Sequence, residues 1–157
     1  MGSGRGDQLA PVLARGTFHW VFAISDVGLS TPAVYAECDR LRDGVAPVSE
    51  PQVSSELMAA LRSGEPAALG AALHNDLEPA AFSLRPDLKE LRDAGVEFGA
   101  LGGIVSGSGP TVAFLTESHE ASLDLSVSLA AADLCRDLRR AKGPVHGAHV
   151  VGAARSD

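Results

Sequence analysis

A glycine-rich loop between two apolar runs holds the residues of this chain that are best suited to chemistry. The loop comprises Ser106, Gly107, Ser108, Gly109 and Pro110, and Thr111 follows directly. Small residues let the backbone turn where a Cβ would clash, and they let a ligand approach the main chain closely. Proteins hold phosphate groups on loops of this kind, but they also build ordinary hairpins from them. Both interpretations stay open at this point.

Two better-defined phosphate-binding motifs do not fit this loop. No Gly-Lys-Ser/Thr follows it, and the next expected element is a strand rather than a helix, so it matches neither a Walker loop nor a dinucleotide-binding fingerprint. The hydroxyls of Ser108 and Thr111 and the bare backbone of Gly102 and Gly103 favour a ligand loop over a hairpin.

Thr31 and Tyr35 form a second candidate pair. They are four residues apart, so they share one face of an expected helix. Tyr35 can serve as an aromatic platform for a flat ligand. Alternatively, Tyr35 flanks the core and Thr31 only caps the helix, with Pro32 at the first helical position. On these residues alone we favour the second interpretation.

The histidines do not indicate a metal site. His146 and His149 are three residues apart, which places them on opposite faces of an expected strand. His19, His74 and His119 have no partner in the sequence. Because no Ser/His/Asp or Cys/His arrangement is present either, we predict neither a catalytic residue nor a metal ligand in this chain.

The elements that must position these residues follow from the apolar patterns. A nearly continuous apolar run predicts a strand at 18–24 that is buried on both faces. Further strands are expected at 100–105, 111–115, 135–141 and 145–151, and helices at 31–43, 53–63, 66–73, 76–84, 86–94 and 118–134. Asn75 and Glu78 form a variant of the capping box, and Gly95 is expected to close the helix that Pro86 opens. In the last helix Leu123, Val127, Ala131 and Leu134 share the face expected to be buried.

This order of elements is the split β-α-β plan of an α+β sandwich, in which helices pack on a mainly antiparallel, ferredoxin-like sheet. With 157 residues, of which 45% are hydrophobic and 4% aromatic, one domain with a core of Ala, Leu and Val is expected.

The net charge of −7 and the dispersed basic residues argue against nucleic acid as a partner. No apolar run is long enough to span a membrane, and Cys38 and Cys135 fit small buried hydrophobes, so we expect a cytoplasmic protein.

Taken together, these segments resemble the C-terminal half of the GHMP kinases. Residues 102–115 are similar to that family's glycine-rich Ser-Gly-Ser-Gly-Pro-Thr motif. Four further segments match in the same order: Gly4-Arg5-Gly6-Asp7, Leu29-Ser30-Thr31-Pro32 with Val34-Tyr35, Asn75-Asp76-Leu77-Glu78, and Gly143-Pro144-Val145-His146-Gly147-Ala148. The five segments cover nearly the whole chain.

The resemblance implies a two-domain kinase that uses ATP and Mg²⁺ to phosphorylate a small molecule, here a cytidine diphosphate-linked methylerythritol. It implies that Tyr35 packs against the cytosine, that Thr31 and Arg5 lie beside the same pocket, and that Gly107 to Thr111 line the cleft between the domains. Asn75 to Glu78 are expected to be structural. Residues 1–16 would be a linker or a remnant of the preceding domain, and 17–155 the C-terminal domain.

The family's phosphate loop, Pro-x-x-x-Gly-Leu-Gly-Gly-Gly-Ser, and its catalytic Asp and Lys have no counterpart in this sequence. Phosphoryl transfer depends on positioning the triphosphate and stabilising its charge, so we expect the chain alone to be inactive and to hold no cofactor. Apolar surface left open by a missing domain would favour a homodimer. Two alternatives remain: a non-enzymatic nucleotide- or metabolite-binding or regulatory module of the same fold, and a GHMP kinase for another acceptor.

Overall fold

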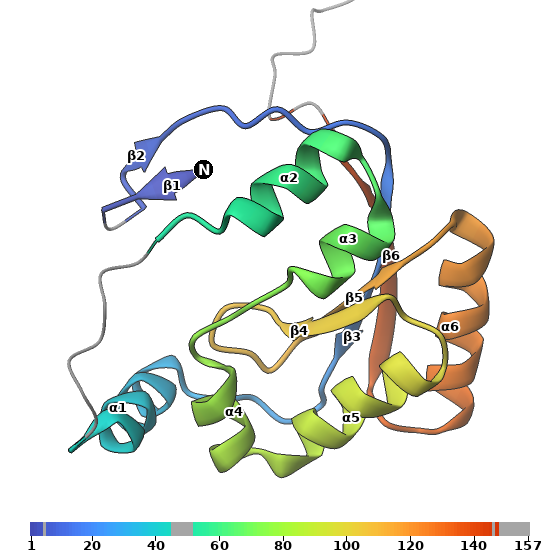
Figure 1. Ribbon diagram of the computed structural model, residues 1–157. Coiled ribbons are helices and arrows are strands. Elements are labelled where there is room, and N and C mark those ends of the chain that lie inside the picture. The colour runs from blue at the N-terminus through green and yellow to red at the C-terminus, as the bar shows by residue number, and fades with distance from the viewer. Residues whose placement is uncertain (5, 45–51, 146, 148–157) are drawn as a thin grey trace, which may run out of the picture.

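A four-stranded antiparallel sheet forms the centre of the computed structural model, which describes residues 1–4, 6–44, 52–145 and 147. Its strands lie in the order β4 (Gly102–Val105), β5 (Val112–Thr116), β3 (Phe18–Ile24) and β6 (Asp137–Gly143) (Figure 1). Each neighbouring pair is antiparallel. The split β-α-β plan predicted from the sequence is thus confirmed.

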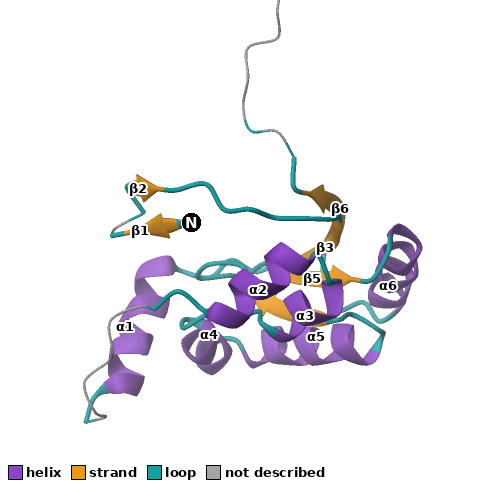
Figure 2. Cartoon of the chain, turned by 45° about the horizontal axis from the view of Figure 1, so that its top comes forward, coloured by secondary structure: helices purple, strands orange, loops and turns teal. Residues whose placement is uncertain are grey.

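Six helices surround this sheet in the described part of the chain. They are α1 (Thr31–Arg42), α2 (Ser55–Ser63), α3 (Pro66–Ala71), α4 (Glu78–Leu84), α5 (Pro86–Glu97) and α6 (His119–Ala131). A small hairpin of β1 (Gly2–Ser3) and β2 (Gln8–Leu9) precedes them and lies apart from the sheet (Figure 2). The segment after β2 meets the end of α2, where the Arg15 amide donates a hydrogen bond of 2.9 Å to the Leu61 carbonyl.

One face of the sheet, which we call the closed face, is sealed by helices α4, α5 and α6. Its side chains alternate along each strand, as a pleated sheet requires. Val21 and Phe114 are opposite each other in the β3–β5 register and are fully buried. Leu88 and Leu91 of α5 and the buried side of α6 pack in the same cluster. This is the larger of the apolar clusters, and it sets the position of every strand.

The other face, which we call the open face, is covered only in part. Helices α2 and α3 pack Ala60 and Leu69 over Phe18 and Leu115. Farther along β3, Trp20 and Phe22 keep part of their surface exposed. The prediction that the strand at 18–24 is buried on both faces is therefore wrong for its open face, because the covering helices do not extend over the whole sheet.

Two predicted details of the helices are also wrong. Gly95 does not close α5 but lies inside it, against the ring of Phe114; a Cβ there would lie 2.1 Å from the Phe114 Cε1 atom. The predicted apolar stripe of α6 faces outward, with Val127 69% exposed, whereas Ser122, Leu125 and Leu129 are buried. The hydroxyl of Ser122 donates to the carbonyl of His119 at 2.6 Å, so it can be buried on the core side of the helix.

The last strand differs from its prediction by two residues at each end. It was expected at 135–141 and spans Asp137–Gly143, paired with all of β3. The strand expected at 145–151, with His146 and His149, falls almost wholly outside the described residues.

Candidate functional site

The glycine-rich loop joins β4 to β5 as a hairpin connection. The Gly109 amide donates to the Ser106 carbonyl at 3.0 Å, and the Ser106 amide donates to the Thr111 carbonyl at 2.8 Å. Gly107, the second residue of this turn, has a φ of 59°, which is the pattern of a type II′ turn and favours glycine. Gly109 has a φ of 83°, and Pro110 follows a cis peptide bond. The hairpin and ligand-loop interpretations therefore do not exclude each other, since a hairpin turn can also present its amides.

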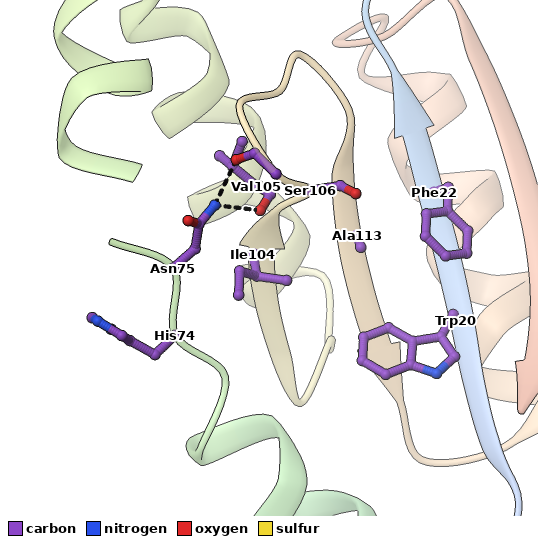
Figure 3. Close-up of a pocket in the computed structure, with 9 residues that line it drawn as sticks. Trp20, Phe22, His74, Asn75, Ile104, Val105, Ser106 and Ala113 are labelled. Atoms are coloured by element: carbon purple, nitrogen blue, oxygen red, sulfur yellow. Dashed lines mark hydrogen bonds between the residues drawn. The ribbon is translucent and has the colours of Figure 1, made fainter. Parts of the chain in front are cut away.

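Asn75 binds the loop from the segment between α3 and α4. Its side-chain Nδ2 donates two hydrogen bonds of 2.8 Å, to the carbonyls of Val105 and Gly107 (Figure 3). Its Oδ1 accepts a bond of 3.0 Å from the Leu77 amide. Both N–H groups of this amide are thus directed at the loop, and its oxygen accepts from its own turn.

Glu78 supports the same loop from the first residue of α4. Its Oε1 accepts a hydrogen bond of 2.9 Å from the Val105 amide. The predicted capping box is therefore wrong: Leu77 occupies the N-cap position of α4 without a side-chain bond, and both polar side chains reach across to β4. The sequence pattern could not show this, because both contacts join residues about 30 positions apart.

Thr31 connects the loop to α1. The side-chain oxygens of Thr31 and Ser108 lie 2.8 Å apart, a hydrogen bond that spans 77 positions in the sequence. The predicted role of Thr31 as helix cap is wrong, because Ser30 occupies that position and its hydroxyl accepts from the Ala33 amide. Thr31 is the first residue of the helix, which leaves its hydroxyl available to the loop.

Tyr35 lies one turn farther along α1 and is 55% exposed. Its neighbours Val34 and Cys38 are buried against Ala80 of α4, so the helix packs through a stripe that excludes the tyrosine ring. Tyr35 therefore does not belong to the core. Arg5, the third predicted binding residue of this pocket, lies outside the described residues.

A cavity of about 380 Å³ lies beside the loop, above the open face of the sheet (Figure 3). Its apolar wall includes Trp20, Phe22 and Ile104, and its polar edge includes Asn75 and Gly107. A second cavity of about 300 Å³ lies between α1 and the start of α4, and Asn75 also lines it. The aromatic wall was not predicted from the sequence, although the period-two spacing of Trp20 and Phe22 was a signal for it.

Charged side chains hold α1 and the segment before it in place beside the loop. Glu37 accepts from Arg40 at 2.6 Å and from the Ser83 hydroxyl at 2.5 Å, which joins α1 to α4. These hydrogen bonds, that of Arg40 first, lower the pKa of Glu37 to about 2. Arg85 donates to the Val27 carbonyl and to the Ser25 hydroxyl, and thereby holds the segment that precedes α1.

Arg85 also forms an ion pair with the Asp87 carboxylate. The hydrogen bond to Asp87 raises the pKa of Arg85 and lowers that of Asp87. Both groups stay charged near neutral pH.

The remaining predicted polar residues do not form a metal centre. His74 bonds the Asp76 carboxylate at 2.8 Å, and the rings of His19 and His119 meet edge-on at 6.0 Å between centroids. Cys38 is buried as predicted, and Cys135 is partly buried, with the pKa of its thiol raised by burial. Among the described residues, no three His, Cys, Asp or Glu side chains gather in a way that could hold a metal ion. No helix in the described part is long and apolar enough to cross a membrane.

Comparison with known proteins identifies a family that is similar to part of this chain. Residues 57–132 match the family described as GHMP kinases C terminal. This match includes Asn75, Glu78 and the whole loop. This segment of the chain is therefore similar to the C-terminal domain of the GHMP kinases.

Curated relatives of more than 50% identity carry the name of one enzyme. The chain is 58% identical over 157 residues to the 4-diphosphocytidyl-2-C-methyl-D-erythritol kinase of Mycolicibacterium smegmatis, covering 98% of this chain and 48% of that protein. It is 55% identical over 151 residues to the same kinase of Thermobifida fusca, covering 96% and 48%. The chain spans about half the length of these curated relatives.

A solved structure of a kinase with the same activity in its name is also similar in fold. The crystal structure of a 4-(cytidine 5'-diphospho)-2C-methyl-D-erythritol kinase superposes with a TM-score of 0.69 and 27% identity, covering 88% of this chain and 47% of the other.

Proposed function

We propose that this chain is the C-terminal domain of an ATP-dependent 4-diphosphocytidyl-2-C-methyl-D-erythritol kinase and forms one wall of its active-site cleft. The observation that carries the proposal is the 2.8 Å hydrogen bond between Thr31 and Ser108. It joins the helix that bears Tyr35 to the glycine-rich loop, so the two candidate binding segments form one surface. The identity of more than 50% to kinases of this name supports the choice of substrate.

In this proposal each segment has a part in binding. Tyr35 stacks on the cytosine of the substrate, since an exposed ring accepts a base without strict steric demand. Thr31 and Arg5 lie beside the same pocket. Gly107 to Thr111 face the transferred phosphate across the cleft.

The other wall of the cleft would come from the part of the kinase that carries the phosphate loop and the catalytic Asp and Lys. ATP and Mg²⁺ act in the complete enzyme. The described residues do not fit a magnesium site on this chain, because the loop offers hydroxyls and amides but no carboxylate. The chain alone is then inactive, with residues 1–16 as linker and 17–155 as the domain. Such an enzyme would work in the cytoplasm.

Binding of cytidine diphosphate, measured by calorimetry, tests the proposal. The 157-residue chain is expected to bind it, and Tyr35→Ala is expected to weaken binding by about tenfold or more, since stacking contributes about 1–3 kcal/mol per base. Tyr35→Phe keeps the ring and is the matched control, with affinity near that of the unmodified chain. Equal affinity for all three chains would contradict the cytosine assignment.

Turnover tests the incompleteness of the chain. With ATP, Mg²⁺ and the cytidyl substrate, the chain alone is expected to transfer no phosphate. A measurable rate would show that the catalytic wall is present in these residues. Binding without turnover, in a protein that has no phosphate-loop half at all, would instead favour a non-enzymatic module.

The open face also supports a proposed homodimer. Trp20 and Phe22 are only partly covered, and uncovered apolar surface promotes association. Sedimentation of the isolated chain is expected to show a dimer, and a monomer at all concentrations would contradict this.

A further inference from the structure

We propose that Asn75 is a positioning residue that sets the direction of the Gly107–Ser108 peptide, so that the Ser108 amide faces an anionic group of the ligand. This inference rests on the proposed function and assigns a role to a residue that the sequence predicted to be a helix cap. It starts from the two hydrogen bonds of Asn75 to the loop carbonyls.

The geometry of the peptide bond carries the first step. The bond between Gly107 and Ser108 is trans, so its carbonyl and its N–H point to opposite sides of the chain. Asn75 holds the Gly107 carbonyl at 2.8 Å. The Ser108 N–H must therefore point away from Asn75.

The peptide between Val105 and Ser106 shows the same relation. Asn75 also holds the Val105 carbonyl, and the Ser106 N–H on that peptide points away to the Thr111 carbonyl at 2.8 Å. One amide side chain thus fixes two peptide planes. The first N–H completes the hairpin, and the second has no such partner.

The Ser108 amide is a donor without an acceptor on the described part of the chain. The loop carbonyls of Val105, Ser106, Gly107 and Thr111 are all engaged by donors on the protein. The amides of Gly107 and Ser108 make no hydrogen bond to a described residue. The carbonyls on the same two peptides as these amides, those of Ser106 and Gly107, are turned to donors on the protein, so this side of the loop favours an anion.

Two further contacts limit how the loop can rearrange. Glu78 holds the Val105 amide, and Thr31 holds the Ser108 side chain. Neither contact acts on the Gly107–Ser108 peptide itself. Asn75 is therefore the contact that decides the direction of this peptide, whereas Glu78 secures the strand before it.

The test is the exchange variant Asn75→Asp with Asp76→Asn, which preserves net charge. The new carboxylate can still accept from the Leu77 amide but cannot donate to the loop carbonyls. In the ¹⁵N-labelled chain, the Ser108 amide resonance is expected to move. Affinity for inorganic pyrophosphate, followed on the same resonance, is expected to fall about tenfold.

Ser118→Ala is the matched structural control. It removes the side-chain cap of α6 on the closed face, away from the loop, so it is expected to lower the melting temperature but to keep the Ser108 resonance and the pyrophosphate affinity. Equal losses of affinity in both variants would overturn the positioning role, as would an unmoved Ser108 resonance in the exchange variant. If the unmodified chain does not bind pyrophosphate, the claim that the loop faces an anionic group is wrong. Cytidine diphosphate binding through Tyr35 tests the proposed function separately, so its failure is distinguishable from either result.

Discussion

The closed and open faces of the central sheet are built from the same strands but differ in what their side chains do. On the closed face, Val21 and Phe114 are fully buried beneath α5 and α6. On the open face, Trp20 and Phe22 line a cavity beside the glycine-rich loop. The closed face holds the fold in place, whereas the open face leaves a cavity beside the loop. Substitutions should therefore cost more stability on the closed face than on the open face.

The largest expected effect is on the closed face. Phe114→Ala removes a fully buried ring and is expected to lower the free energy of unfolding by about 3–5 kcal/mol. Phe22→Ala removes a half-buried ring from the open face and should cost about 1 kcal/mol. Urea denaturation of both variants measures the difference. If the two variants lose equal stability, the distinction between the faces is wrong.

Substitution of Gly95 tests how tightly the closed face is packed. Gly95→Ala places a methyl group against the Phe114 ring and is expected to destabilise the chain by about 1–3 kcal/mol, although alanine favours a helix. Gly28→Ala is the control, since nothing lies within 4 Å of its Cβ position and its backbone is not left-handed. Thermal unfolding should leave the control within about 1 kcal/mol of the parent. A neutral Gly95→Ala would mean that the closed face is loosely packed.

The hydrogen bond between Thr31 of α1 and Ser108 of the loop should contribute less to stability than the closed-face residues do. A double-mutant cycle of Thr31→Val and Ser108→Ala is expected to give a coupling free energy of about 0.5–1.5 kcal/mol, because the bond joins two neutral hydroxyls near the surface. Denaturant unfolding of the four chains measures it. Strictly additive effects would show that the two segments do not act as one surface.

The smallest effect concerns pH and the support of α1. The pKa of Glu37 falls from an ordinary 4.5 to about 2 in the folded chain, so its stabilising contribution is present above 4.5 and is lost as pH falls toward 2. Glu37→Gln is expected to remove this part of the pH dependence, by a small amount because the pair is near the surface. Melting temperatures between pH 2 and 6 test it. Parallel curves for both chains would contradict the assigned pKa.

Local patterns predicted the elements well. The apolar run at 18–24 and the order of strands and helices were enough for the split β-α-β plan, because both depend on neighbours in the sequence. The outward stripe of α6 and the position of Gly95 were missed, because which face is buried depends on what packs against it. For the same reason the sequence could not distinguish the covered end of β3 from its open end.

The candidate site was predicted by residue type but not by role. Thr31, Ser108 and the loop were named, and the structure brings them together. Asn75 and Glu78 were interpreted as a local cap, since that spacing satisfies a helix end at short range. Their true acceptor and donor lie on β4, and contacts across 27 or more positions leave no periodic signal.

The most direct test of the central claim is a map of amide shifts on the ¹⁵N-labelled chain during titration with cytidine diphosphate. We predict shifts at Thr31, Tyr35 and the loop residues 107–111, with α5 and α6 of the closed face unchanged. Shifts confined to α5 and α6, or none at saturating ligand, would contradict the claim that α1 and the glycine-rich loop form the ligand-binding wall.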